Sequence, residues 1–435
     1  MTSTTLDAPQ RLLSRTSGLV ARNDLAGHLA THGPLALFPD DRSGHDAVLR
    51  AVAESGLLGR GGGGFPSAVK WDAARRGGRR PLVVVNAMEG EPASAKDRVL
   101  LSYSPHLVLD GAEVAASVLG ATEVVVCVPE GAGPMAPSLQ AAIAERTRAR
   151  LSLRRFRVAR PPGRYVTGEE SALVAWLATG SALPTMRIDK SVPLTVARRP
   201  ALVHNAETLA HVALIARHGP AWFRQAGTFD APGTTLVTVT GAVRVPGVVE
   251  VALGTPVADI LARAGADTRL AGVLIGGYGG AWLPPSQVTT AYAPAPLAAV
   301  GATHGVGIVI ALPTSSCGVA ETARIARYLS TESAGQCGPC VFGLPAIADD
   351  LELLWTGRAD ADVVARIRRR TGLVEGRGAC RHPDGAARVV RSALAVFADD
   401  VRAHAAGRPC PGRAAASVLT FPTGSTFPTG GGSGW

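Results

Sequence analysis

A run of glycines near the start of the chain constrains the fold more than any other stretch. Residues 56–66 read Gly-Leu-Leu-Gly-Arg-Gly-Gly-Gly-Gly-Phe-Pro, so six of these eleven residues are glycine. Few side chains in this run can do chemistry, so the backbone itself must be the working surface. Glycine has no Cβ and adopts positive φ readily, which lets successive N–H groups converge on a phosphate or lie flat beneath a ring.

The glycine spacing does not fit the two best-known phosphate loops. Gly59, Gly61 and Gly64 match G-x-G-x-x-G, but the dinucleotide-binding form of that motif needs a strand before it. Residues 45–54 instead carry apolar side chains at helical spacing. A Walker loop is excluded because Gly-Lys-Ser/Thr is missing. A flexible linker is the plain alternative, but Phe65 and Pro66 close the run, and an ordered pattern follows at once.

Composition describes a globular chain. Its 435 residues, 46% of them hydrophobic and 18% charged, allow about two to four domains. The sequence has no apolar run long enough to cross a membrane and no signal peptide after Met1, so we expect a cytoplasmic protein. The net charge of +10 is scattered and aromatic residues make up only 5%, which favours an anionic dinucleotide or an acidic protein partner over nucleic acid.

The patterning changes along the chain. Residues 1–33 form a polar arm with a helix expected near 23–32, and residues 34–228 alternate strand and helix patterns, which is typical of an α/β sheet covered by helices. The expected strands are 82–85, 122–128 and 153–158, and the expected helices are 45–55, 67–75, 105–119, 136–148, 169–177 and 206–218.

The remaining chain divides into three expected parts. Residues 229–300 begin with a strand, turn and strand over 234–251 and a helix over 256–264. Residues 301–410 carry apolar positions at three-four spacing, which predicts a small helical bundle. Residues 411–435 end in a repetitive stretch rich in Gly, Ser and Pro, so we expect a disordered tail. The helices expected in the bundle are 320–330, 343–355, 361–371 and 384–404.

Four motifs in a fixed order resemble one family. They are Asn86-Ala-Met-Glu-Gly-Glu-Pro, Gly168-Glu-Glu-Ser, His204-Asn-Ala-Glu-Thr and Ser333-Ala-Gly-Gln-Cys-Gly-Pro-Cys. Together they resemble the FMN- and NADH-binding flavoprotein subunit of respiratory complex I, whose family includes the diaphorase subunits of NAD-linked hydrogenases and formate dehydrogenases. The resemblance implies an α/β Rossmann-like FMN domain, a small ubiquitin-like β-grasp (SLBB) domain, and a helical bundle with an iron–sulfur site.

The resemblance also implies a reaction. FMN would take hydride from NADH, and single electrons would pass through one [4Fe-4S] cluster to a protein acceptor such as a ferredoxin or a [2Fe-2S] subunit. The alternative is a degenerate, non-catalytic binding or assembly module with the same fold. It is favoured by two departures from the family pattern: Met88 where relatives carry aspartate, and Ala334 where they carry the first cluster cysteine.

The resemblance implies a set of cofactor-binding residues. The FMN side comprises Gly59, Gly61, Gly62, Gly63, Lys70, Asn86, His204, Asn205 and Thr208, and Tyr165, Gly168 and Val203 are further cofactor-binding residues not assigned to either side. The NADH side comprises Phe65, expected to stack on the nicotinamide, and the carboxylates Glu89, Glu91, Glu169 and Glu170. Carboxylates suit ribose hydroxyls and repel a 2′-phosphate, so we expect NADH rather than NADPH. A core position for Phe65, a solvated Lys70, a turn-forming Asn86 and helix-start acids at 169–170 are the plain alternatives.

The cysteines raise one open question. Cys337 and Cys340 form C-x-x-C, which in a cytosolic chain indicates a metal site or a redox pair, and the resemblance implies that Cys380 is the distant ligand. A four-iron cluster takes four thiolates. We expect Cys317 to replace the missing first ligand, with Cys410 as the other candidate and Cys127 in a strand core. A cluster with three cysteine ligands, or no cluster, stays open.

Overall fold

The computed structural model describes residues 11–13, 24–35, 41–77, 80–187, 189, 192–267, 269–408 and 410–422. The first sheet has the strand order β3-β2-β1-β5-β4, and its strands are parallel except for β4, which runs antiparallel to β5. The bounds are β1 (Leu82–Asn86), β2 (Glu123–Cys127), β3 (Arg155–Ala159), β4 (Leu194–Val196) and β5 (Arg199–Asn205). The three strands expected in this part of the chain are present. The sequence did not predict β4 or β5.

Helices cover both faces of this sheet, which is why its central strands are apolar on both sides. Along β1, Val83 and Val85 join the core beneath the larger helical layer, whereas Leu82 and Val84 face α7. In the larger layer α5 crosses α8 so closely that a Cβ on Gly111 would lie 1.8 Å from the carbonyl oxygen of Leu209. The helices are α1 (Leu25–His32), α2 (Arg42–Ser55), α3 (Ser67–Arg76), α4 (Lys96–Tyr103), α5 (Pro105–Leu119), α6 (Met135–Arg148), α7 (Glu170–Thr179) and α8 (Ala206–Phe223).

The second sheet has the order β7-β6-β10-β8-β9. Its bounds are β6 (Thr234–Gly241), β7 (Gly247–Ala252), β8 (Leu270–Ile275), β9 (Ala281–Leu283) and β10 (Ile308–Pro313), with α9 (Val257–Arg263) and α10 (Pro294–Ala299) between strands. The central strand β10 lies beyond the boundary expected at residue 300, so that boundary is too early. β10 pairs parallel to β6 and antiparallel to β8, and pairing across such sequence distances leaves no mark on the local pattern.

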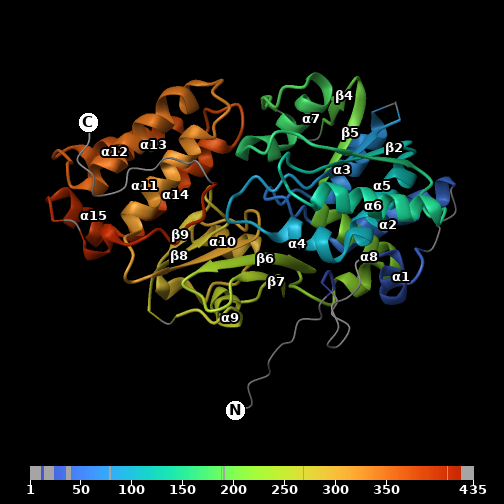
Figure 1. The fold of residues 1–435 in the computed structure, drawn as a ribbon, viewed down its shortest axis with the longest axis horizontal. Helices are drawn as coiled ribbons and strands as arrows, with labels where there is room; N and C mark the ends of the chain where they lie inside the picture. The colour runs from blue at the N-terminus through green and yellow to red at the C-terminus, as the bar shows by residue number, and fades with distance from the viewer. Residues whose placement is uncertain are drawn as a thin grey trace, which may run out of the picture.

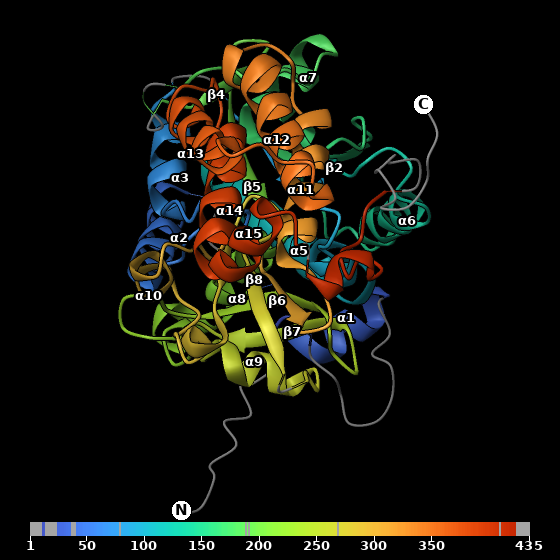
Figure 2. The same cartoon turned by 90° about the vertical axis from the view of Figure 1, so that its left-hand side faces the viewer.

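The C-terminal helices pack beside the second sheet (Figures 1 and 2). They are α11 (Gly318–Thr331), α12 (Leu344–Thr356), α13 (Val363–Val374), α14 (His382–Val396) and α15 (Ala398–Ala405). The fourth expected helix is therefore two helices, broken at Phe397. The N–H of Trp282 on β9 donates to Ser392 Oγ on α14 at 2.9 Å, which ties the bundle to the sheet.

Both ends of the chain differ from expectation. Residues 411–422 are packed rather than disordered: Leu419 is buried, and Ser417 Oγ donates to Glu321 at 2.7 Å. The expected tail therefore begins too early, and residues 423–435 lie outside the described residues. In the N-terminal arm the expected helix is present as α1, and Leu12 is buried. Residues 1–10 and 14–23 of the arm are not described. No helix in the described part of the chain is long and apolar enough to span a bilayer.

Candidate functional site

The glycine run forms an ordered loop between α2 and α3. Its base is closed by two backbone hydrogen bonds, from Gly59 N–H to Phe65 O at 2.9 Å and from Ser67 N–H to Leu57 O at 3.0 Å. At its tip, a Cβ on Gly63 or Gly64 would meet no protein atom within 4 Å. The loop therefore presents bare backbone to an open space, as binding a ligand through N–H groups requires.

The loop lies against the carboxyl ends of β1 and β5, where parallel sheets place ligands. Asn86 and Asn205 are directly paired there. A Cβ on Gly61 would lie 3.2 Å from the Cβ of Asn205, so the missing side chain allows the loop to approach. Asn86 Nδ2 donates to Gly168 O at 2.9 Å, which brings the Gly168-Glu-Glu motif to the same edge. Three of the four motifs thus meet at one place.

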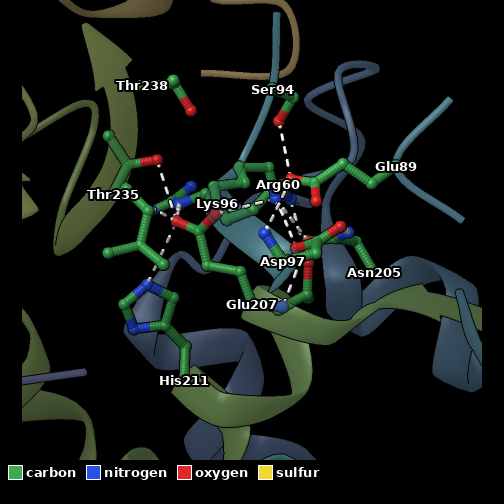
Figure 3. A network of polar contacts seen from close by, with 12 residues as sticks. Arg60, Glu89, Ser94, Lys96, Asp97, Asn205, Glu207, His211, Thr235 and Thr238 are labelled. Carbon is green, nitrogen blue, oxygen red and sulfur yellow. Dashed lines mark hydrogen bonds and ion pairs between the residues drawn. The ribbon is translucent and has the colours of Figure 1, made fainter. Parts of the chain in front are cut away.

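A buried ionic network underlies this edge (Figure 3). Lys96 Nζ lies 2.8 Å from Asp97 Oδ1, 3.0 Å from Glu207 Oε2 and 2.9 Å from Asn205 Oδ1. Glu207 Oε1 accepts from Thr235 Oγ1 at 2.9 Å, so the network reaches the second sheet. Its carboxylates and cations lie on elements far apart in sequence, and the network fixes how the two sheets meet.

Burial and opposite charges act against each other in this network. Burial alone would lower the pKa of Lys96, but Asp97 and Glu207 raise it above its ordinary value. Burial raises the pKa of Asp97, which Lys96 counters. The sequence did not predict roles for Arg60, Lys96, Asp97 or Glu207. An adjacent Lys-Asp pair after the Glu91 loop, and an acid inside the His204 to Thr208 motif, were the available indications.

Several residues that we expected to bind a cofactor make hydrogen bonds within the protein. Thr208 Oγ1 accepts the N–H of Arg60 at 2.9 Å and is fully buried, so it holds the glycine loop. His204 Nε2 accepts from the indole of Trp71 at 2.8 Å, and burial lowers its pKa well below the ordinary value. The indole of Trp71 therefore occupies Nε2, and the expectation that His204 belongs to the FMN side stays a prediction. Met88, which stands where relatives carry aspartate, is 1% exposed and packs within the sheet core.

Three of the four expected carboxylates, Glu89, Glu169 and Glu170, are of two kinds. Glu89 accepts from the N–H groups of Asp97 and Arg98 at the start of α4, and Glu169 accepts from Ser171 and Ala172 at the start of α7. These two are helix caps. Glu170 instead lies 2.7 Å from Lys70 Nζ, with side chains 26% and 22% exposed. This pair is within reach of a bound molecule.

Glu91 lies where the first sheet, the second sheet and the bundle meet. Its Oε2 accepts from Tyr278 N–H at 3.0 Å and Tyr165 OH at 3.2 Å. Its Oε1 is buried and has no hydrogen-bond partner among the described residues. Burial raises the pKa of Glu91 to about 8, and the bonds from Tyr278 and Tyr165 oppose this rise. At neutral pH the carboxyl therefore keeps its proton on Oε1, and this buried hydroxyl is a donor without an acceptor among the described residues.

Glu91→Gln should stabilise the fold at alkaline pH. Because the pKa rises from 4.5 to about 8 on folding, the folded state keeps a proton that the unfolded chain releases. The free energy of unfolding therefore falls as pH rises between these values. Glutamine has no such proton to lose. The advantage of the variant over wild type in urea denaturation should grow across this window by on the order of 4 kcal/mol. A difference independent of pH would contradict this.

Three cysteines gather at the loop before α12 and the start of α14. Burial, with the thiols of Cys337 and Cys380 beside it, raises the pKa of Cys340 to about 12. The N–H of Cys340 donates to Cys337 O at 3.0 Å, so the C-x-x-C segment is a tight turn. Three thiolates are one fewer than a four-iron cluster takes.

Cys317 does not join these three cysteines. It caps the start of α11, and its Sγ lies 3.4 Å from His404 Nε2. α11 has 14 residues, which carry the chain about 21 Å before the Cys337 turn begins. The expectation that Cys317 is the fourth cluster ligand is therefore wrong. The other candidate, Cys410, lies with Cys317, and Cys127 is buried in β2 as expected.

The cysteine turn and the Gly168 motif are neighbours. The ring of His382 stands edge-on to Tyr165, with centroids 5.4 Å apart. Tyr165 N–H donates to Glu332 at 3.0 Å. The charge of Glu169 also acts on Cys380. An electron leaving the open edge of the first sheet would therefore meet the cysteines across one packed interface.

Known proteins share this arrangement. Residues 52–214 match the Nuo51 FMN-binding domain, residues 236–272 match the SLBB domain, and residues 320–404 match the NADH-ubiquinone oxidoreductase-F iron-sulfur binding region. An F subunit of NADH-quinone oxidoreductase from Rhizobium meliloti is 30% identical over 380 residues, covering 84% of this chain and 90% of the relative. The F subunit from Mycobacterium bovis is 30% identical over 408 residues, covering 88% and 89%.

A solved structure agrees with these sequence matches. A chain of an NAD⁺-reducing [NiFe]-hydrogenase in its H₂-reduced state superposes with a TM-score of 0.77 at 32% identity. The match covers 83% of this chain and 63% of the hydrogenase chain, so the present chain corresponds to less than two thirds of that longer one.

Proposed function

Because the chain belongs to the family of flavoprotein subunits that includes the F subunits of NADH-quinone oxidoreductase, we propose that its open glycine edge is the place where NADH is oxidised. The resemblance expected from the motifs is confirmed, as are the α/β class, the SLBB domain and the iron–sulfur region. The protein is an NADH-oxidising flavoprotein that uses FMN. The observation that carries our assignment is the bare backbone of Gly63 and Gly64 beside the paired Asn86 and Asn205.

The residues at this edge fit FMN. The open space at the loop tip is a cradle that any Cβ would fill, and the N-terminus of α3 follows directly, where an anion is favoured. Lys70 supplies a cation beside the carbonyl of Val203 at 3.3 Å. FMN, when bound, accepts the two electrons of NADH as hydride and releases them singly. The protein's part is to hold donor and acceptor in contact and to exclude water.

The same edge has polar groups for NADH. We assign Glu170 as an acceptor for ribose hydroxyls, Glu91, whose Oε1 carries the proton at neutral pH, as a donor to the carboxamide oxygen, and Phe65, half-buried at the loop base, as the stacking ring. The carboxylate of Glu170 at this position would repel the 2′-phosphate of NADPH. We therefore propose NADH as the preferred dinucleotide.

The onward path runs through the cysteine turn. Cys337, Cys340 and Cys380 fit a cluster in which one iron has a ligand other than cysteine, because Ala334 offers none and Cys317 lies elsewhere. We propose that electrons pass from there to a ferredoxin-like or [2Fe-2S] protein. A chain of net charge +10 suits an acidic acceptor. We place the protein in the cytoplasm as a peripheral subunit of a redox complex.

Glu170→Gln should raise KM for NADH about tenfold to a hundredfold, because hydrogen bonds to charged groups contribute about 1.5–3 kcal/mol. Bound FMN per chain should stay unchanged. Glu352→Gln is the matched control: Glu352 pairs with Arg327 at 2.9 Å with similar exposure, but lies on α12, and its KM should equal that of wild type. Loss of FMN in Glu170→Gln would assign this residue to the flavin instead.

A further inference from the structure

A second group of potential metal ligands lies at the other end of α11, away from the cysteine turn. The side chains of Cys317, His404 and Cys410 bring one sulfur, one nitrogen and one sulfur within 4.8 Å of one another. Cys317 and His404 are each 1% exposed. Neither the flavin edge nor the iron–sulfur turn uses these three residues, of which Cys410 is partly exposed.

Local structure brings the three together from separate segments. Cys317 ends the loop after β10 and caps α11, with its Sγ accepting the N–H of Ala320 at 3.3 Å. His404 lies in the last turn of α15, and Cys410 opens the segment that returns along α11. That return depends on Gly412, where a Cβ would lie 2.7 Å from the carbonyl carbon of Ser316. Only a glycine lets the two backbones come this close.

The imidazole is oriented as a metal ligand. His404 Nδ1 lies 3.2 Å from the carbonyl oxygen of Trp355, and a carbonyl can only accept, so Nδ1 carries the proton. Nε2 therefore presents its lone pair toward Cys317. The N–H of Cys410 donates to Nε2 at 3.4 Å, which agrees with an unprotonated nitrogen. Histidines that bind metals commonly fix their tautomer through such a backbone carbonyl.

The spacing fits one ion rather than a cluster. In tetrahedral zinc sites the Zn–S and Zn–N bonds of about 2.3 and 2.0–2.1 Å place a sulfur and a nitrogen about 3.6 Å apart. The Cys317 Sγ to His404 Nε2 distance is 3.4 Å. Two thiolates and an imidazole around one ion are typical of zinc. We propose that Cys317, His404 and Cys410 bind a zinc ion.

Zinc here would act as a structural clamp. Two thiols and one Zn²⁺ give a bis-thiolate complex and two released protons, so the bound site adds no net charge to the interior. Asp400 lies one turn before His404 on α15 and its charge acts on both Cys317 and His404, but its carboxylate oxygens lie outside the group of donor atoms within 4.8 Å of one another.

The clamp would fix a segment that reaches the NADH side. Beyond Cys410 the chain continues to Thr420, whose carbonyl accepts from Tyr278 OH. Tyr278 N–H donates to Glu91 at 3.0 Å. Zinc at the start of this segment would thus hold the packing behind Glu91 without contacting the substrate.

The test is metal content per chain in the full-length protein purified without chelators. Wild type should hold about one zinc ion beside its iron. Cys317→Ser and Cys410→Ser should lose zinc and keep iron. The matched control, Cys340→Ser, should lose iron and keep zinc. Wild type stripped by chelator and titrated with Co²⁺ should develop thiolate-to-cobalt absorption, which gives a readout even where a serine variant folds poorly.

Three results would overturn the proposal. Equal zinc content in wild type and Cys317→Ser would show that the thiol binds no metal. Loss of iron in Cys317→Ser with zinc unchanged would return this residue to the iron–sulfur cluster. A Cys317–Cys410 disulfide in the native protein, seen by mass spectrometry without reductant, would make the pair an oxidised staple.

Discussion

Gly63→Val should abolish FMN retention while leaving the fold intact. The Cβ of residue 63 would meet no protein atom within 4 Å, and its φ is not in the left-handed region, so the protein itself tolerates a side chain there. A valine would instead fill the space that we assign to the flavin. We expect affinity for FMN to fall on the order of a hundredfold, equivalent to about 3 kcal/mol, measured by fluorescence titration of the FMN-free protein.

Two further variants make this result specific. Gly247→Val is the matched control, because a Cβ at Gly247 also meets nothing within 4 Å and φ there is ordinary, but the residue opens β7. It should bind FMN as wild type does. Gly61→Val should lose FMN and also lower the melting temperature, because its side chain would press on Asn205. If Gly63→Val and Gly247→Val bind FMN equally well, the flavin does not lie at the loop tip.

Lys96→Met should destabilise the FMN-free protein by about 3–5 kcal/mol, because removing one partner leaves buried charges without compensation. Lys96 is the cation between Asp97 and Glu207, and the three side chains are 3%, 4% and 0% exposed. The free energy of unfolding from urea denaturation is the measurement. The loss should shrink as the pH falls, because burial raises the pKa of Asp97 and its protonation removes part of the uncompensated charge.

The control for this loss of stability is a solvent-exposed ion pair, whose attraction water screens. Arg76 and Asp72 pair at 2.6 Å on α3 with side chains 67% and 51% exposed. Arg76→Met should change the free energy of unfolding by less than about 1 kcal/mol. A cost for Lys96→Met no larger than that of Arg76→Met would mean that the network in Figure 3 contributes little to stability.

The sequence predicted what is local in this fold. Helices such as α5 and strands such as β1 follow from periodicity, and the open glycine loop follows from its composition. Strand β10 was not predicted, because its partners β6 and β8 are distant in sequence. The ion pair between Lys96 and Glu207 could not be predicted for a similar reason. The two residues are distant in sequence and pair only when α4 and α8 meet in the fold. A sequence shows the charge of such residues but not the partner that makes burial tolerable.

The site shows the same limit in two residues. His204 stands inside a binding motif, yet its ring turns inward to Trp71 because alternate residues of β5 face opposite sides of the sheet. Strand β5 was not predicted, so the side of the sheet that this ring faces could not be predicted either. Cys317 was expected at the iron–sulfur turn because it precedes α11, but a straight helix carries the chain away from it. The number of cysteines in the sequence identified Cys317 and Cys410 as candidate ligands. Only the packing of α15 and the close approach at Gly412 show that both lie with His404, apart from the iron–sulfur turn.

The measurement that tests the central claim most directly is an anaerobic titration of the purified, FMN-loaded protein with NADH, followed by visible absorption. We expect NADH to bleach the flavin band at about one equivalent per flavin, since hydride carries two electrons, and NADPH to bleach it far less well. A flavin band that NADH leaves unchanged, or a chain that takes up no FMN, would contradict the account and favour a binding or assembly module that keeps the fold without turnover.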